Sequence, residues 1–262
     1  MDTKKNYKNF EMNTLIKCLI DSRCRISLFF IVFCTIFVFS CEKFEYEEEY
    51  KEEYKEETKE EYINSKYPTK EELDIFYASY WNKPEYQQAH TAKNAIYLTK
   101  EEKEIYYYLN IVRLNPPLFA QTYASGYEGD NGWGRGYAWE ERKRTLIETL
   151  SDMEPLGLIV PDEELFETAH CFAYEGGKLG ITGHDRSQTS CISDYHAECC
   201  QFGGGKNGLS IIMSFLIDAG ENNAELGHRR ILLDSRYDKL GASIQPHKTY
   251  VFVAVLDLKR KN

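Results

Sequence analysis

An apolar run near the C-terminus restricts the fold of this chain more than any other feature. Residues 251 to 256 read Val-Phe-Val-Ala-Val-Leu, which puts apolar side chains on both faces of a strand. A strand that is buried on both faces lies in a sheet that helices cover above and below. The pattern therefore predicts an α/β fold, in which helices and a central sheet form an α-β-α sandwich.

The preceding part of the chain reads mainly as helices. Periodicity and end signals predict helices at about 70–81, 99–115, 162–177 and 209–217, and strands at 239–244 and 249–258. Thr99 and Glu102 form a capping box, and Gly176 with Gly177 would end the third helix. A chain of 262 residues with 42% hydrophobic content has material for one main core. We place this domain at residues 98–259, after a transitional segment at 67–97.

The N-terminus has the layout of a targeting signal. Residues 26–40 carry no charge and follow several basic residues, and a helix that spans a bilayer needs about 20 apolar residues. The run leads through Val38-Phe39-Ser40 into Cys41, which resembles the lipobox of bacterial lipoproteins. That resemblance implies a signal peptide at residues 1–41, a lipidated Cys41 and attachment to a membrane. The alternative is a signal-anchor helix with an incidental cysteine.

Acidic residues dominate the next segment, 42–66, where eleven glutamates stand against five lysines. Such a segment repels itself and buries little, so we expect a tether between the membrane and the domain. An acidic stretch directly after a lipidated cysteine also resembles the surface-export signal of Bacteroidetes lipoproteins, which implies an exported outer-membrane or cell-surface protein. The formal net charge of −10 argues against a nucleic-acid partner, because phosphate backbones bind to basic faces.

Four of the eight cysteines lie in the folded part, namely Cys171, Cys191, Cys199 and Cys200. Cys199 and Cys200 are adjacent and cannot pair with each other without a strained ring. The local disulfide that we expect therefore joins Cys191 to one of these two residues. Four free thiols in a small core are the alternative.

Four groups of residues follow one another in an order that one protein family shares. They are Leu109-Asn110-Ile111-Val112-Arg113, then His170-Cys171-Phe172-Ala173 leading to Thr182-Gly183-His184, then Glu198-Cys199-Cys200-Gln201-Phe202-Gly203, and finally Phe215 to Gly220 with Gly227-His228-Arg229-Arg230-Ile231-Leu232. Together they resemble the bacterial form of the CAP superfamily, the cysteine-rich secretory, antigen 5 and pathogenesis-related proteins. The resemblance implies a three-layer α-β-α sandwich of the CAP type with a mainly antiparallel central sheet.

The same resemblance implies a cleft tetrad of His184, Glu198, Asp218 and His228. Two imidazoles and two carboxylates suit a divalent cation such as zinc, with His184 and His228 as its ligands. The acids would ligate the ion, orient the rings or hold a water. The four groups could instead act as a general acid and base near pH 7, or form an inert hydrogen-bonded network. Cys199 departs from the family, because an asparagine usually follows the first acid.

Three classes of function follow from this interpretation. The first is an exported binding module whose cleft holds a metal and a lipid, sterol or peptide ligand. The second is a metal-assisted surface hydrolase or peptidase, and the third is a non-catalytic envelope protein that makes protein contacts. Ser187 and Ser190 follow His184 closely, but no Gly-x-Ser-x-Gly elbow surrounds them. Glu225 is the competitor of Asp218 for the place of the second acid, and the family register favours Asp218.

Overall fold

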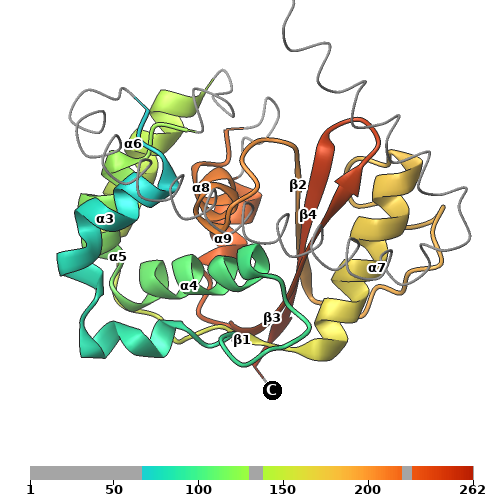
Figure 1. Cartoon of the computed structure of the whole chain (residues 1–262), viewed down its shortest axis with the longest axis horizontal. Coiled ribbons are helices and arrows are strands. Elements are labelled where there is room, and N and C mark those ends of the chain that lie inside the picture. The colour runs from blue at the N-terminus through green and yellow to red at the C-terminus, as the bar shows by residue number, and fades with distance from the viewer. Residues whose placement is uncertain (1–66, 130–137, 220–225, 262) are drawn as a thin grey trace, which may run out of the picture. The chain divides into compact units, whose positions relative to one another are not determined.

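The computed structural model describes residues 67–129, 138–219 and 226–261 (Figure 1). The predicted signal peptide, Cys41, the acidic tether and Glu225 lie outside the described residues. The fold described below is that of one compact unit, Asn64–Asn262. Within the described ranges, no helix has both the length and the apolar character that are needed to cross a membrane.

Helices precede most of the sheet along this unit. In order, the elements are α3 (Lys70–Trp81), the 3-10 helix η2 (Pro84–Ala89), α4 (Lys100–Leu114), α5 (Pro116–Phe119), the π-helical turn η3 (Ala120–Ala124), α6 (Trp139–Ser151), β1 (Val160–Pro161), α7 (Glu163–Leu179), β2 (Ala197–Phe202), α8 (Gly208–Ile217), α9 (Gly227–Leu232), β3 (Tyr237–His247) and β4 (Val251–Arg260). Helix α3 has the predicted bounds. Helix α4 begins with the predicted capping box, in which Thr99 Oγ1 accepts from Glu102 N at 3.2 Å and Glu102 Oε2 accepts from Thr99 N at 2.8 Å.

The four strands form one mixed sheet in the order β1-β3-β4-β2. Strands β3 and β4 pair antiparallel, and so do β4 and β2. Strand β1 instead pairs parallel with β3, with Val160 opposite Lys239. The expectation of a mainly antiparallel sheet is therefore right only in part, because β1 reaches its neighbour through the long crossover that contains α7 and β2.

The two faces of the sheet bury separate sets of side chains. Along β4, Val253 and Val255 pack with Phe172 of α7, whereas Ala254 and Leu256 belong to the larger core on the opposite face. Helix α7 packs on β3 and β4, and helices α4 and α8 contact β3 and β2 (Figure 1). The apolar run is thus buried from its second residue onward, as its pattern predicts.

Helix α7 extends past the glycine pair that was expected to end it. It continues to Leu179 and ends at Gly180, which has a left-handed φ of 79°. Gly177 lies inside the helix for a packing reason, since a Cβ at this position would lie 2.3 Å from the carbonyl oxygen of Pro246 in β3. The glycine therefore marks a close approach of helix and strand, and it does not mark a helix end.

The segment before residue 98 contributes to the main core. Trp81 of α3 and Ala89 of η2 are buried within it. Asn110 of α4 joins this segment to the domain, because its Nδ2 donates to the carbonyl oxygen of Ala89 at 3.1 Å and to that of Ile159 at 2.9 Å. Arg113, one turn later in α4, is fully buried and donates to backbone carbonyls. These two motif residues are thus structural, and they satisfy backbone groups that the core would otherwise leave without partners.

The disulfide differs from the expected one. Cys171 of α7 pairs with Cys191, with 5.6 Å between their Cα atoms, while Cys199 and Cys200 are free and buried. The expected pairing is wrong because the loop returns Cys191 to Cys171 of α7, and the bond to Cys171 leaves no sulfur for Cys200 although Cys191 packs against the same cluster. Successive side chains of β2 point to opposite faces of the sheet. Cys199 lies in the larger core and Cys200 in the core beside α7.

Candidate functional site

The first half of the predicted tetrad is a histidine and carboxylate pair. His184 lies in the loop after α7, and Glu198 is the second residue of β2. Their Nδ1 and Oε1 atoms are 2.8 Å apart, and the glutamate side chain is 3% exposed while the histidine side chain is 55% exposed. An ionised carboxylate can only accept a hydrogen bond, so the proton lies on Nδ1 and the Nε2 nitrogen has a free lone pair when the ring is neutral.

The other oxygen of Glu198 is held by Arg186, which lies two residues after His184. Arg186 Nε donates to Glu198 Oε2 at 3.1 Å, and its Nη2 makes a second, shorter bond to the same oxygen. The guanidinium carbon lies 4.6 Å from the ring centroids of both Phe172 and Tyr195. Ring contacts on both sides and hydrogen bonds in the plane fix the position of this buried cation.

Arg186 also binds a second buried carboxylate, Asp257 of β4. Its Nη2 lies 2.9 Å from each of the two Asp257 oxygens, and Thr168 Oγ1 of α7 lies 2.6 Å from Asp257 Oδ2. Burial raises the pKa of Asp257 to about 7, although Arg186 acts in the opposite direction. Burial would also raise the pKa of Glu198, but hydrogen bonds from His184 and Arg186 hold it below its usual value. One cation is thus shared by two carboxyls, of which Glu198 stays ionised and Asp257 takes up a proton near neutral pH.

The hydrogen bond to Glu198 also acts on the histidine. It raises the pKa of His184 above the ordinary value, and burial opposes this rise. Because the side chain is more than half exposed, the effect on the free energy of folding is small. The pair therefore raises the pH at which this imidazole loses its proton, and a metal that binds the ring at lower pH must displace that proton.

The second half of the tetrad, Asp218 and His228, is also a carboxylate and histidine pair. Asp218 ends α8 in a left-handed conformation with φ 55°, and His228 is the second residue of α9. Asp218 Oδ1 lies 2.9 Å from His228 Nδ1, and Asp218 Oδ2 accepts from the backbone nitrogen of His228 at 3.1 Å. The aspartate is 4% exposed and the histidine 24% exposed. The Asp218 carboxylate reaches this histidine because the end of α8 lies beside α9.

Arg229 of α9 holds α9 against α8 and α6. Its side chain is 3% exposed and donates to the carbonyl oxygens of Leu216 and Ile217, which belong to the last turn of α8. It also donates to the carbonyl oxygen of Arg142 in α6 at 2.8 Å. Burial lowers the pKa of Arg229 to about 10, so the guanidinium remains charged at neutral pH. It satisfies carbonyls at a helix C-terminus, where a positive charge also interacts favourably with the helix dipole.

The structure brings a third potential ligand to the first pair. Ligand atoms of His184, Glu198 and Cys200 lie within 4.8 Å of one another. This set of nitrogen, oxygen and sulfur donors could hold a divalent metal. Burial raises the pKa of the Cys200 thiol well above its usual value, so metal binding would have to remove its proton. Neither Asp218 nor His228 contributes an atom to this group.

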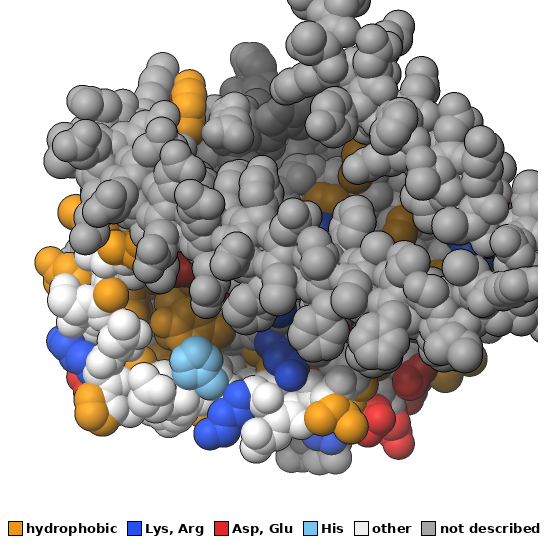
Figure 2. Space-filling model, in the orientation of Figure 1, with side chains coloured by type: hydrophobic (Ala, Val, Ile, Leu, Met, Phe, Trp, Pro, Cys, Tyr) orange, Lys and Arg blue, Asp and Glu red, His pale blue; other side chains and the backbone are white. Residues whose placement is uncertain are grey.

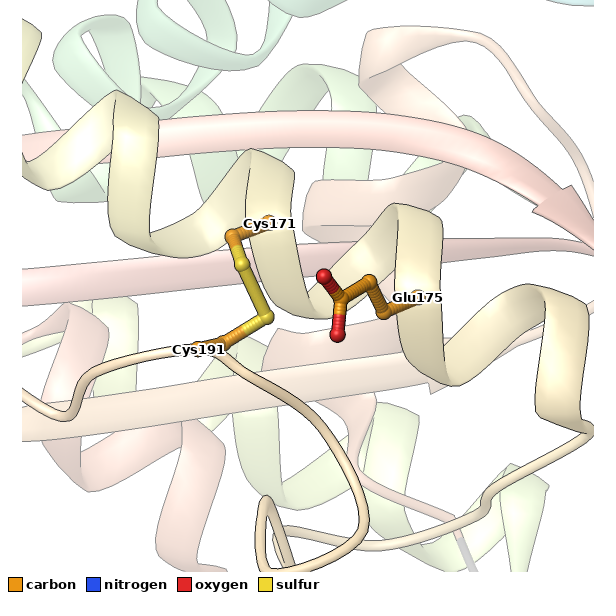
Figure 3. Close-up of side chains that lie close together, drawn as sticks. All are labelled: Cys171, Glu175 and Cys191. Atoms are coloured by element: carbon orange, nitrogen blue, oxygen red, sulfur yellow. A yellow bond between two sulfur atoms is a disulfide. The ribbon is translucent and has the colours of Figure 1, made fainter.

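A second group of donors is excluded by its chemistry. Cys171, Glu175 and Cys191 lie close together, and Figure 3 shows the Glu175 carboxylate beside the bond between the two sulfurs. Both sulfurs belong to the disulfide and have no thiolate to offer a metal. Glu175 is also engaged by Ser190, whose backbone nitrogen and Oγ lie 2.7 Å and 2.6 Å from its oxygens. Ser190 therefore holds the loop to α7, and no histidine activates it.

Arg186, Asp257 and Thr168 were not selected from the sequence, although one signal was available. Asp257 is the first charged residue in β4, after a run of apolar residues that are buried on both faces. A carboxyl at such a position needs a buried partner. Arg186 supplies the partner from a loop, where no periodicity distinguishes a buried arginine from a solvent-exposed one.

Comparison of the chain with protein-family models, with curated proteins and with solved structures found no match.

Proposed function

We propose that this chain is an exported, lipid-anchored protein of the CAP superfamily whose cleft binds a divalent metal ion. The proposal includes an α-β-α sandwich of the CAP type, supported by α7 on one face of the sheet and α4 and α8 on the other. Cys41 would carry the lipid, and residues 42–66 would form the tether. As the resemblance implies, the cleft would take a lipid, sterol or peptide ligand at the outer membrane or cell surface.

One observation carries the metal-binding proposal. Each of the two predicted histidines has its Nδ1 bonded to a carboxylate that is at most 4% exposed, at 2.8 Å for His184 and 2.9 Å for His228. Metal-binding histidines usually have one ring nitrogen bonded to a carboxylate, which fixes the ring and directs the other nitrogen to the ion. Both oxygens of Glu198 are already bonded, which favours an orienting role for this acid over ligation.

The donors fit zinc better than magnesium or calcium. Imidazole nitrogens and thiolate sulfur are preferred by zinc, whereas magnesium and calcium prefer oxygen ligands. Cys200 offers a sulfur that lies within 4.8 Å of ligand atoms of His184 and Glu198. The residues of this chain would orient the two imidazoles, supply the buried thiol and hold Arg186 between the two carboxylates. A bound ion would supply Lewis acidity or a fixed point for a ligand.

Zinc titration of the purified full chain tests this function, with His184→Ala and His228→Ala measured separately. Loss of a residue that only orients a metal ligand weakens metal binding roughly 10-fold to 100-fold. We expect the loss of either histidine, as a ligand, to weaken zinc binding by at least this much. If both histidines hold one ion, the double variant loses little more than either single variant. Zinc binding that is absent in the wild type, or that is unchanged in both variants, contradicts the proposal.

The adjacent cysteines provide a matched comparison. Cys200→Ser removes the sulfur beside His184, and Cys199→Ser changes a thiol on the opposite face of the same strand. With cobalt as a substitute ion, a thiolate ligand gives a charge-transfer band in the near ultraviolet. We expect this band in the wild type and in the Cys199 variant, and we expect Cys200→Ser to abolish it. The same band in the Cys200 variant would assign the ion to other ligands.

A further inference from the structure

A separate hollow lies between the beginnings of α3 and α4 and the turn before α4. Its volume is about 550 Å³, and its lining comprises Lys70, Asp74, His90, Ala92, Lys93, Lys100, Lys103, Glu104, Tyr107 and Tyr108. None of these residues belongs to the histidine and carboxylate pairs described above. Four lysines in one hollow are notable in a chain whose formal net charge is −10.

The two acids in the hollow are engaged by other groups. Asp74 Oδ1 accepts from the hydroxyls of Tyr108 at 2.6 Å and Tyr123 at 2.7 Å, and Asp74 Oδ2 accepts from Lys70 at 2.8 Å. Glu104 lies 3.4 Å from the same Lys70 ammonium. The Lys70 side chain is only 9% exposed and is thus neutralised within the wall. The lining thus has four lysines against these two acids, which leaves a net positive charge, and Glu104 is shared between Lys70 and Lys100.

Two of the three remaining lysines lie where a helix disfavours positive charge, and Lys93 lies in the turn before that helix. Lys100 and Lys103 are in the first turn of α4, where the helix dipole disfavours positive charge. The Lys100 ammonium lies 3.8 Å from Glu104. The Lys103 ammonium donates to the backbone carbonyl oxygen of Lys93 at 3.5 Å, and both residues line the hollow. The same turn also carries Glu101 and the buried Glu102, but neither residue lines the hollow, so the lysines of the lining are the groups that can attract an anion there.

A flat aromatic surface forms another part of the wall. The rings of His90 and Tyr107 are stacked, with centroids 4.5 Å apart and an interplanar angle of 12°. On the face drawn in Figure 2, blue lysine or arginine side chains lie next to a pale-blue histidine. Burial and then the charge of Lys93 lower the pKa of His90, so its imidazole is neutral at pH 7. A neutral ring beside three cations can donate a hydrogen bond to an anion without adding to the repulsion among them.

We propose that this hollow is a binding site for a small, multiply charged anion of the phosphate class, held by Lys93, Lys100 and Lys103 beside His90. Lysine binds phosphate as a point charge, and several lysines suit a group that carries more than one negative charge. The volume admits a small phosphorylated molecule. This site does not depend on the metal proposal, because the two sets of residues are distinct.

The test uses the purified full chain and inorganic pyrophosphate as the probe, measured by calorimetry at low salt. We expect saturable binding that Lys93→Gln with Lys103→Gln weakens by about tenfold or more, because two charge-assisted contacts are lost. The matched control is Lys83→Gln with Lys206→Gln, which removes the same charge from exposed lysines outside the hollow. This control should change the affinity by less than about twofold, since exposed distant charges are screened by salt. The His184→Ala and His228→Ala double variant should bind pyrophosphate as the wild type does.

The histidine gives an independent readout of the same site. In NMR titrations, pyrophosphate should raise the pKa of His90, because a bound anion stabilises the protonated ring. The charges of Lys70, Lys93, Lys100 and Lys103 act in the opposite direction and lower this pKa, and the anion partly offsets them. The shift should disappear in the Lys93 and Lys103 double variant. The proposal is overturned if the wild type shows no saturable binding, or if both lysine double variants lose affinity equally. Equal loss would mean general attraction of anions to surface lysines.

Discussion

At the scale of single residues, Arg186, Glu198 and Asp257 determine the charge balance beside His184. Among the described residues, Arg186 is the only arginine or lysine that bonds to both Glu198 and Asp257, and together with His184 it keeps Glu198 ionised. While His184 is neutral, a buried arginine between two ionised acids leaves one negative charge in excess, which burial disfavours. Protonation of Asp257 near pH 7 removes this excess. We therefore expect Asp257 to control the pH response of the fold.

Asp257→Asn should flatten the pH dependence of the unfolding free energy. Because the pKa of Asp257 is about 7 in the folded chain and about 3.9 in an unfolded one, the folded state binds more protons between these values. Stability therefore falls as the pH rises through this window, by an amount on the order of a few kcal/mol. Because the folded-state pKa of His184 is also raised, the unfolding free energy decreases further above about pH 6.5. This part of the pH dependence should persist in the Asp257→Asn variant.

Urea unfolding at several values between pH 4 and pH 8 measures this slope. Asp194→Asn is the control, since it removes an exposed carboxyl that pairs with Lys259. A variant at Asp257 that keeps the full slope below pH 6.5 would assign the proton uptake to another group.

At the scale of elements, the disulfide holds the loop that carries His184 and Arg186. Cys171 lies in α7 and Cys191 near the end of this loop, 20 residues away along the chain. Replacing both with serine should reduce the unfolding free energy by about 3 kcal/mol, because the unfolded chain gains freedom. Urea unfolding measures this loss, and a reducing agent should reproduce it in the wild type. If reduction destabilises the serine variant as well, another bond is responsible.

The contact of α7 with the sheet depends on glycine in β3. A Cβ at Gly241 would lie 2.0 Å from the carbonyl carbon of Leu165, which is a backbone atom that no side-chain rotation can move. Gly241→Ala should therefore lower stability by about 3 kcal/mol or more through overpacking. Gly227→Ala is the matched control, because within the described part of the chain no heavy atom other than those of its chain neighbours lies within 4 Å of the added methyl group. Thermal unfolding of both variants checks the contrast, and equal midpoints would contradict this close approach.

At the scale of the whole molecule, lipid attachment remains a prediction from the sequence. Cys41→Ser should abolish incorporation of labelled fatty acid and release the exported chain from the membrane fraction of a bacterial host. Cys34→Ser is the control, since this cysteine lies inside the apolar run and precedes the proposed processing site. Lipid labelling that survives in the Cys41 variant would exclude this anchor.

The sequence predicted those elements whose signals are local. Helix α3 and the capping box of α4 follow from neighbouring residues, and the doubly buried strand β4 follows from a continuous apolar run. The sequence did not predict α6, and it did not identify β2 as a strand. In β2 the residues Glu198 to Gln201 are all buried, so polar and apolar side chains do not alternate along it. Glu198 is tolerated there because Arg186 approaches from a separate loop.

The candidate site was likewise predicted only in part from the sequence. His184, Glu198, Asp218 and His228 were selected from ordered motifs, and each histidine does bond to the neighbouring acid of its own half. The role of Arg186, the partner of Cys171 and the position of Cys200 beside His184 were decided only by the tertiary structure. Local hydrogen bonds and periodicity are encoded in adjacent residues. The partner of a buried charge or thiol is set only when α7, the loop after it and the sheet pack together. This packing excludes water, and an unpaired polar group then costs free energy.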